Sequence, residues 1–220
     1  MLHTHNNPPP DDEAAGLTRF SGQKRRQILQ AAARLFLRDG FEPTTMDAIA
    51  REAGVSKATV YAHAKNKQEL FAGIVQGRVA LVYRSVELMD AESAAAADAL
   101  SRFARHFIQM ILSPEAQGIY RIVVAEAPRN PELGRIFFEQ GPRAVTQRLV
   151  AILEAQVKTG QLAVDDPLAA AQEFLGMLHG KFHLPCVLGV AQQPPLDELA
   201  RAAERVVRTF LKVYGTGGQR

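Results

Sequence analysis

Residues 45–63 read TMDAIAREAGVSKATVYAH, and this stretch decides how the rest of the chain is interpreted. Thr45 and Ser56 each precede a short helical pattern, where a hydroxyl can accept hydrogen bonds from the free amides of a first helical turn. Gly54 lies between the two patterns, where the chain must reverse quickly and glycine tolerates positive φ. The spacing predicts a helix-turn-helix. Its interior positions are Ile49, Ala50, Ala53, Gly54, Val55 and Val60.

Amphipathic patterns flank this motif on both sides. Residues 25–41 carry apolar side chains at helical spacing and stop near Gly40, which predicts a preceding helix. Downstream, Asn66 and Glu69 have the spacing of a capping box and predict a long helix over residues 67–89. We expect this long helix to connect the helix-turn-helix to the rest of the chain.

Residues 28–71, ILQAAARLFLRDGFEPTTMDAIAREAGVSKATVYAHAKNKQELF, resemble the N-terminal DNA-binding domain of the TetR/AcrR family of bacterial transcriptional regulators. One position departs from the family pattern, because Ala64 stands where a phenylalanine usually follows the Tyr-x-His segment. Residues 119–178 resemble the ligand-binding C-terminal domain of the AcrR-like and AefR-like branch. The two resemblances imply a dimeric DNA-binding regulator with a domain that receives a small molecule.

The composition fits a globular chain with two domains. The chain has 220 residues, of which 47% are hydrophobic, and no run reaches the roughly 18 apolar residues of a membrane-spanning helix. The start of the chain lacks the pattern of a signal peptide. The lone cysteine, Cys186, permits no intramolecular disulfide and suits the reducing cytoplasm. The net charge is +3, and residues 21–66 hold eight Lys or Arg against four Asp or Glu, which favours a nucleic-acid partner there.

We expect an all-α fold, because no strand pattern follows the connecting helix and helical patterns repeat to the end of the chain. Pro128 and the Gly141–Pro142 pair are expected to end or interrupt helices. The first residues combine a proline run with acidic side chains, which predicts disorder. The expected divisions are a disordered arm (1–20), a DNA-binding domain (21–66), a connector helix (67–89), an effector-binding and dimerisation domain (90–214) and a frayed tail (215–220).

The recognition helix is expected over residues 56–64, with its first turn in the major groove of DNA. Lys57 suits guanine because it can donate to O6 and N7, while Ala58 and Thr59 offer methyl groups to thymine. The resemblance implies phosphate contacts for the Tyr-x-His segment and for Lys67. The alternative for each residue is an ordinary solvated side chain, and for Tyr61 it is a half-buried core tyrosine. The predicted DNA-binding residues are Thr44, Thr45, Ser56, Lys57, Ala58, Thr59, Tyr61, His63 and Lys67.

The last two helical patterns predict an oligomer interface. The pattern from Leu196 onward is an apolar stripe longer than a terminal helix needs to cover a domain. Gly176 and Gly180 lie four apart in the preceding pattern, where each costs about 1 kcal/mol relative to alanine, and close contact across a two-fold axis would offset this. The resemblance implies a four-helix dimer interface. The predicted interface residues are Gly176, His179, Gly180, His183, Val206 and Phe210.

Two histidine pairs allow a metal hypothesis. His179 and His183 have a workable spacing for a metal pair, and Cys186 follows nearby. No carboxylate or further cysteine adjoins them, so interface hydrogen bonds are the preferred interpretation. His3 and His5 lie in the predicted arm, where such a pair is more often incidental. We therefore expect no metal and no cofactor.

A sensory pocket in a helical domain should be mostly apolar with a few polar groups. Aromatic and methionine side chains at helical spacing can line such a pocket, or they can be plain core. His106 can donate to a ligand or rim the core. A lipophilic or aromatic effector fits these residue types. The candidate pocket residues are Phe103, His106, Phe107, Met110, Tyr120, Phe137, Phe174 and Met177.

The expected function is a homodimeric repressor of a palindromic operator, released by a small lipophilic or aromatic effector and bound to the nucleoid in the cytoplasm. An enzyme is poorly supported, because the chain has no Gly-x-Ser-x-Gly elbow, no phosphate-binding glycine loop and no His-Glu-x-x-His. The alternative is a DNA-binding protein of the same fold that acts without an effector, in an architectural role or through a protein partner. Dense packing between Phe103 and Met177 would favour that alternative.

Overall fold

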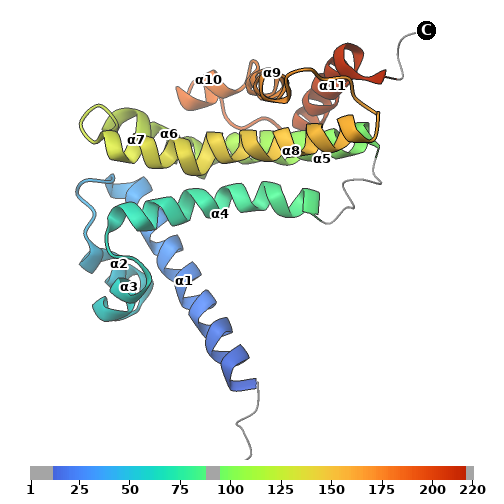
Figure 1. Cartoon of the computed structure of the whole chain (residues 1–220). Helices are drawn as coiled ribbons and strands as arrows, with labels where there is room; N and C mark the ends of the chain where they lie inside the picture. Colours follow the sequence, from blue (N-terminus) through green and yellow to red (C-terminus); the bar gives the residue numbers. More distant parts are fainter. Residues whose placement is uncertain (1–11, 88–94, 217–220) are drawn as a thin grey trace, which may run out of the picture. The chain divides into compact units, whose positions relative to one another are not determined.

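The computed structural model describes residues 12–87 and 95–216. The chain divides into two compact units, residues 1–71 and residues 72–220. Apart from an isolated bridge between Leu162 and Gly215, the regular structure of the described residues is helical (Figure 1). The all-α prediction is confirmed.

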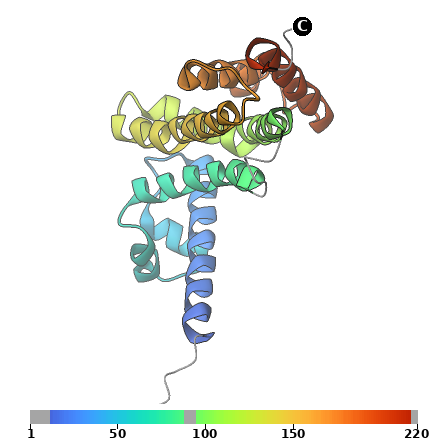
Figure 2. The same cartoon turned by 45° about the vertical axis from the view of Figure 1, so that its right-hand side comes forward.

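The first unit contains α1 (Asp12–Asp39), α2 (Met46–Ala53), α3 (Lys57–His63) and the first turn of α4 (Lys67–Glu87). Three fully buried rings form its centre: Phe36 lies 5.0 Å from Phe41, and Phe71 lies 5.8 Å from Phe41, between ring centroids. Ile49 and Val60 are each 0% exposed, so α2 and α3 bury the faces predicted from their sequence. Figure 2 shows α2 and α3 beside α1.

The predicted caps form around α2, α3 and α4. The Thr45 hydroxyl accepts from the Ala48 amide at 3.1 Å, and the Ser56 hydroxyl accepts from the Thr59 amide at 3.1 Å. Gly54 has φ +63°, the left-handed conformation expected for the turn. Asn66 caps α4 by accepting from the Glu69 amide at 2.9 Å. Each interaction joins residues close in sequence, which is why a short stretch defines this motif.

The start of α1 differs from the sequence prediction. The helix begins at Asp12, whereas residues 1–20 were expected to be a disordered arm. A helix that is already nucleated extends at little further cost, and residues 12–17, DEAAGL, include good helix formers. The prediction is therefore wrong for residues 12–20. His3, His5 and the rest of residues 1–11 lie outside the described part of the chain.

The second unit is a helical bundle. After the remainder of α4, its helices are α5 (Ala96–Ile111), α6 (Pro114–Glu126), α7 (Pro131–Phe138), α8 (Ala144–Lys158), α9 (Pro167–His179), α10 (His183–Val187) and α11 (Leu196–Tyr214). Helix α11 packs along α5 and α9, α8 packs against α9, and α10 packs against α6. In both views α9, α10 and α11 lie on one side of α5 and α8 (Figures 1 and 2). Phe103, Phe174 and Phe210 are completely buried between these helices.

A π-helical turn, η1 (Glu139–Arg143), joins α7 to α8 where the Gly141–Pro142 pair was expected to interrupt a helix. Proline has no amide hydrogen and cannot donate in the α-helical pattern, so a wider turn accommodates it. The turn places Gly141 against α4, since a Cβ at this residue would lie 3.4 Å from Cγ1 of Val75. The π-helical turn thus lets the backbone at Gly141 approach α4 at Val75 closely.

Helix α9 ends at His179 with Gly180 as its C-cap, whereas the metal-pair spacing of His179 and His183 assumed one helix that carries both. Gly180 has φ +41° and ψ −142°, a conformation available essentially only to glycine, and a Cβ there would lie 3.0 Å from the Met177 carbonyl oxygen. Gly180 therefore ends the helix and does not lie in its middle, while its place in an interface stays a prediction. Its turn places His179 on α9 and His183 on α10.

The end of the chain is more ordered than the predicted frayed tail. Gly215 bridges to Leu162, and the Thr216 hydroxyl donates to the Gly160 carbonyl at 2.8 Å. These contacts tie residues 215 and 216 to the loop after α8, so the prediction is wrong for them. Residues 217–220 and the last two residues of the predicted connector, 88–89, lie outside the described residues. No helix in the described ranges has the length and apolar character needed to cross a membrane.

Candidate DNA-binding helix and effector cavity

Helix α3 has one buried and one open side. Val60 is 0% exposed beneath it, while Ser56, Lys57 and Ala58 are exposed at its first turn. Tyr61 is 47% exposed, so about half of its side chain is open to an incoming molecule, and the DNA contact stays a prediction beside the half-buried core alternative. Thr59 and His63 are half-buried. The first turn therefore presents donors and a methyl group to an incoming molecule without any rearrangement of the core.

Lys57 is paired in this structure. Its Nζ lies 2.7 Å from Oδ1 of Asp47 on α2, and both side chains are 59% exposed. The hydrogen bond with Asp47 raises the pKa of Lys57 above its ordinary value. An exposed pair of this kind contributes little stability, so Lys57 can exchange Asp47 for another acceptor at small cost.

Lys67 and Thr44 have internal roles that the sequence analysis did not predict. The Lys67 Nζ donates to the carbonyls of Phe41 and Glu42 at 2.8 Å each and lies 4.8 Å from the Phe41 ring centroid. Thr44 is 3% exposed, and its hydroxyl donates to the Gly40 carbonyl at 2.7 Å. The predicted phosphate contact of the Thr44 side chain is therefore wrong, because that hydroxyl is already used inside the loop.

Basic side chains are exposed on α1, which packs against α2. Lys24, Arg25 and Arg26 are exposed on α1 and have no ion-pair partner among the described residues. Arg34 is bound to Glu52 on α2 at 2.9 Å, which links the two helices at their surface. The first unit therefore combines an open helix end with a basic surface, the combination that binds a phosphate backbone.

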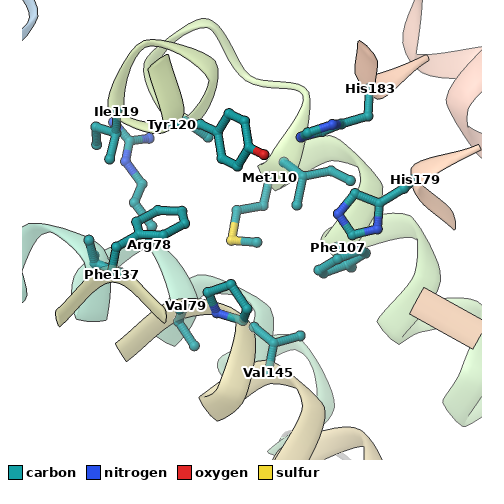
Figure 3. Close-up of a pocket in the computed structure, with 15 residues that line it drawn as sticks. Arg78, Val79, Phe107, Met110, Ile119, Tyr120, Phe137, Val145, His179 and His183 are labelled. Carbon is teal, nitrogen blue, oxygen red and sulfur yellow. The ribbon is translucent and has the colours of Figure 1, made fainter. Parts of the chain in front are cut away.

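The second unit contains a mainly apolar cavity of about 150 Å³ (Figure 3). Side chains from every helix between α4 and α10 contribute to it, although these helices are far apart in sequence. Phe107, Met110, Tyr120 and Phe137 line it as predicted. The remaining lining residues are Val75, Arg78, Val79, Ile111, Ala116, Ile119, Gly141, Pro142, Val145, His179 and His183.

The other four predicted pocket residues lie elsewhere. Phe103 and Phe174 are 0% exposed and belong to the core, where their ring centroids lie 6.3 Å apart. His106 is exposed, and its Nδ1 bonds to the Arg102 carbonyl at 2.9 Å. Met177 lines a separate surface hollow with Phe182 and Val206. Helical spacing alone did not separate core residues from cavity residues.

A continuous series of rings forms one wall of the cavity. Between ring centroids, Phe107 lies 5.6 Å from His179, His179 lies 4.9 Å from His183, and His183 lies 5.2 Å from Tyr120. Tyr120 in turn lies 6.0 Å from Phe137. All four contacts are edge-to-face, the favourable arrangement for aromatic pairs. His179 and His183 therefore line the cavity, a role that the sequence did not predict, and their place in an interface stays a prediction.

The two histidines differ in their environment. The Nδ1 of His179 bonds to the Leu175 carbonyl at 2.8 Å. Burial lowers the pKa of His183, and the neighbouring His179 lowers it further, so the neutral ring is favoured. No group of three His, Cys, Asp or Glu suited to a metal ion occurs in the described ranges.

Two arginines belong to the surroundings of the cavity: Arg78 lines it, and Arg121 lies next to the lining residue Tyr120. The Arg78 Nη1 lies 3.7 Å from a Glu115 carboxylate oxygen, which balances the charge of the guanidinium that reaches the cavity. The Arg121 Nη1 donates to the Val187 carbonyl at 3.2 Å and so ties α10 to α6. The α4 residues in this wall could have been found in the sequence, since Val75, Arg78 and Val79 follow helical spacing beyond the first unit.

Only some of the predicted interface residues are exposed to solvent and can contact a second chain. Phe210 is 1% exposed and packs against Phe174, with 5.0 Å between ring centroids, so its place in an interface is wrong. The apolar stripe of α11 is used within the chain, and its outer face carries Arg201, Arg205 and Arg208. Gly176 on α9 is exposed, and a Cβ there would meet nothing within 4 Å.

Comparison with known proteins agrees with this division. Residues 28–74 match the model of bacterial regulatory proteins of the tetR family, and residues 98–216 match the C-terminal domain of AefR-like transcriptional repressors. The chain belongs to the TetR family. It is therefore a DNA-binding transcriptional regulator and not an enzyme.

Solved TetR-family structures resemble the chain over most of its length. A transcriptional regulator from Mesorhizobium loti MAFF303099 is 30% identical, with a TM-score of 0.76 over 89% of this chain and 98% of that one. The flavonoid-responsive regulator FrrA is 34% identical, with a TM-score of 0.69 and the same coverage. The nucleoid occlusion factor SlmA of Vibrio atlanticus is 30% identical, over 73% of this chain and 82% of SlmA.

Proposed function

We propose that this TetR-family regulator is a homodimeric repressor, bound to a near-palindromic operator on the nucleoid in the cytoplasm and released by a small aromatic or lipophilic effector. The observation that carries the proposal is the mainly apolar cavity of the second unit, because it gives the regulator a place for an effector. The same cavity disfavours the effector-independent alternative, for which dense packing between Phe103 and Met177 was expected.

The DNA contacts are assigned to the open side of α3. Lys57 reads guanine after leaving Asp47, while Ala58 and Thr59 contact thymine methyl groups. Tyr61 and His63 contact phosphates, together with Ser56 and Thr45 at the helix N-termini. Lys67 takes part with its remaining N–H, since two carbonyls already occupy the others. Thr44 is not included.

Effector release is assigned to α4. This helix places Leu70 and Phe71 in the first unit's core and Val75, Arg78 and Val79 in the cavity wall. An effector that fits only one position of this helix shifts the population toward that position. The two half-sites of a palindrome are about 34–36 Å apart, so a small change in the spacing of the recognition helices weakens DNA binding. Linkage requires DNA to weaken effector binding by the same factor.

Dimerisation is assigned to α9 and α11. A Cβ at Gly176 would meet no atom of the chain within 4 Å, so packing within the chain does not require glycine at this position. Close approach of a second α9 would explain the glycine, and this supports the dimer. Exposed Leu168 lies eight residues earlier on the same helical face. The resemblance to TetR regulators supports a four-helix arrangement. Val206 is half-buried at the edge of this surface and remains in the proposed interface.

The operator is tested by selection from a random duplex library with the full-length protein at physiological salt. We expect enrichment of a near-palindrome, with affinity that falls steeply with salt because phosphate contacts release counterions. The effector part is tested by measuring effector affinity with and without the operator duplex. Enrichment of single half-sites, or an effector affinity that the operator leaves unchanged, contradicts the proposal.

The dimer is tested with Gly176→Arg, and Gly77→Arg is the control. Both glycines are helical and exposed, and a Cβ on either would meet nothing within 4 Å. We expect sedimentation velocity to show a monomer for Gly176→Arg and a dimer for Gly77→Arg. If Gly176→Arg remains a dimer with unchanged affinity, α9 is not the interface.

The similarity to SlmA is a reason to test the alternative as well, a DNA-binding protein that acts without an effector, in an architectural role or through a protein partner. The name of SlmA gives it a role in nucleoid occlusion, and 73% of this chain aligns with it. The alternative predicts operator binding that no apolar small molecule alters. The proposed repressor predicts that at least one class of aromatic molecule weakens operator binding.

A further inference from the structure

The polar groups of the cavity gather at one place on an otherwise apolar wall. The Tyr120 hydroxyl, the His183 ring and the His179 ring lie on the same side in Figure 3. Neither the Tyr120 hydroxyl nor the His183 ring has a hydrogen-bond partner within the part of the chain that the structure describes. A ligand in the cavity would therefore meet apolar surface everywhere except at this corner.

The hydrogen bond of His179 decides what this corner offers. A carbonyl oxygen can only accept, so the contact with Leu175 makes Nδ1 the donor. In the neutral ring, Nε2 then carries a lone pair and acts as an acceptor. The corner can therefore accept a hydrogen bond from a hydroxyl of a ligand.

The charges around the cavity disfavour an anionic ligand. Among the described lining residues, Arg78 is the one permanently charged side chain, and Glu115 lies 3.7 Å from it. A carboxylate placed beside Arg78 would face the Glu115 carboxylate. A carboxylate placed beside His179 would meet a lone pair, and the donors that remain at this corner, the Tyr120 hydroxyl and one N–H of His183, are uncharged. Burying an anion there is therefore less favourable than burying a neutral hydroxyl.

The size of the cavity limits the ligand further. A protein cavity of about 150 Å³ lined by apolar side chains is known to accommodate benzene. The cavity here has about the same volume, and edge-to-face rings form part of its wall. A single aromatic ring fits it without movement of the wall, whereas a molecule with several fused or linked rings requires expansion or an exposed remainder.

We propose that the cavity selects an uncharged molecule with a single phenol-type ring, whose hydroxyl donates to Nε2 of His179. The inference deepens the proposed function, since it names the class of effector for the same cavity. Phe107 and Phe137 contact the ring, and His179 provides the selectivity for the hydroxyl. Through the Val187 carbonyl, Arg121 ties α10, which carries His183, to α6, which carries Tyr120.

The test compares phenol, toluene and benzoate, which have similar sizes but differ in the group that meets His179. Binding to the full-length dimer is measured at pH 7 by calorimetry and by thermal shift. We expect phenol to bind about tenfold more tightly than toluene, as one additional hydrogen bond provides. Benzoate is expected to bind at least about tenfold more weakly than phenol. Toluene binding as tightly as phenol, tighter benzoate binding, or no binding by any probe overturns the inference.

The His179→Phe variant tests whether Nε2 of His179 causes the preference for phenol over toluene. This variant keeps an aromatic ring beside Phe107 and removes the acceptor, so the preference for phenol over toluene should vanish while toluene affinity is retained. Retained toluene affinity also shows that the cavity is folded. Tyr120→Phe is the matched variant, because it removes the neighbouring hydroxyl and leaves His179, and it should keep the preference within about twofold. A preference that survives His179→Phe, or disappears only in Tyr120→Phe, contradicts the role of His179.

Operator binding separates this inference from the proposed function. If phenol binds with the expected preference but leaves operator affinity unchanged, the ligand class stands and the release mechanism fails. If another apolar molecule releases the operator while phenol binds no better than toluene, the release mechanism stands and the ligand class fails.

Discussion

The recognition helix and the cavity are built in different ways. Helix α3 depends on contacts between near neighbours, such as the Ser56 hydroxyl with the Thr59 amide. The cavity depends on side chains from helices as distant in sequence as α4 and α10, so no short segment defines it. A substitution that removes one cap of α2 or α3 should therefore affect only that helix. A substitution that shifts any of the helices α4 to α10 should change the shape of the cavity.

The strongest test of this difference is Ile49→Asp. Ile49 is 0% exposed under α3, and burying a carboxylate there should cost at least about 4 kcal/mol, enough to unfold the first unit. We expect operator binding to disappear while phenol binding remains, because all cavity residues lie in the second unit. Leu37→Asp, at a side chain that is 38% exposed, is the control and should retain both activities. Loss of both activities in Ile49→Asp would show that the units do not fold separately.

Gly180→Ala and Gly54→Ala compare the turn glycines of the two units. Alanine at Gly180 meets both an unfavourable conformation and the Met177 carbonyl at 3.0 Å, so we expect a loss of about 2–3 kcal/mol of unfolding free energy. At Gly54 no neighbour lies within 4 Å of the added Cβ, so we expect about 1 kcal/mol. Urea denaturation measures both. Gly54→Asn should recover part of the loss, and equal losses at the two glycines would refute the steric argument at Gly180.

Lys67→Met tests whether the lysine stabilises the loop at Phe41 and Glu42, contacts DNA, or does both. Loss of its two bonds to the carbonyls of Phe41 and Glu42 should lower the unfolding free energy by about 2 kcal/mol. If its third N–H also contacts phosphate, the salt dependence of operator binding should decrease by about one ion. Lys65→Met, at an exposed neighbour, controls for the lost charge. Unchanged stability in Lys67→Met would mean that the two carbonyl contacts contribute nothing.

The smallest expected effect belongs to Asp47→Asn. This change removes the carboxylate that holds Lys57, and we expect operator affinity to rise by about twofold to fivefold at low salt. Fluorescence anisotropy with a labelled operator measures the change. Asp39→Asn removes a similar exposed charge from the Arg38 pair in the same unit, and it should have a smaller effect. Equal effects would indicate a general charge effect without a specific role for Lys57.

The sequence predicted the first unit in detail, including the caps at Thr45, Ser56 and Asn66. These features depend on residue types within one or two turns of each other, so the order of residues contains the information. It failed for Thr44, because exposure depends on how the loop after α1 folds back. Chain order could not show that the Thr44 hydroxyl meets the Gly40 carbonyl.

In the second unit the sequence predicted where the helices lie better than which of their residues face the cavity and which face the core. Four of the eight predicted pocket residues line the cavity, while Phe103 and Phe174 pack in the core. A helical pattern identifies an apolar face but not what lies opposite it. The sequence did not predict His179 and His183 in the cavity wall, because a continuous helix through Gly180 was assumed, and the turn there brings His183 toward Tyr120.

The π turn at residues 139–143 implies that the cavity is sensitive to the length of the chain as well as to its composition. Such a turn holds one residue more than the α-helical path. Deleting Pro142 would remove the residue that the wider turn accommodates, restore an uninterrupted helix and rotate α7 relative to α8 by about 100°. Phe137 and Val145 would then no longer face the same space. Related regulators that differ by a single insertion or deletion in this segment are therefore expected to recognise different effectors, even where their lining residues are the same.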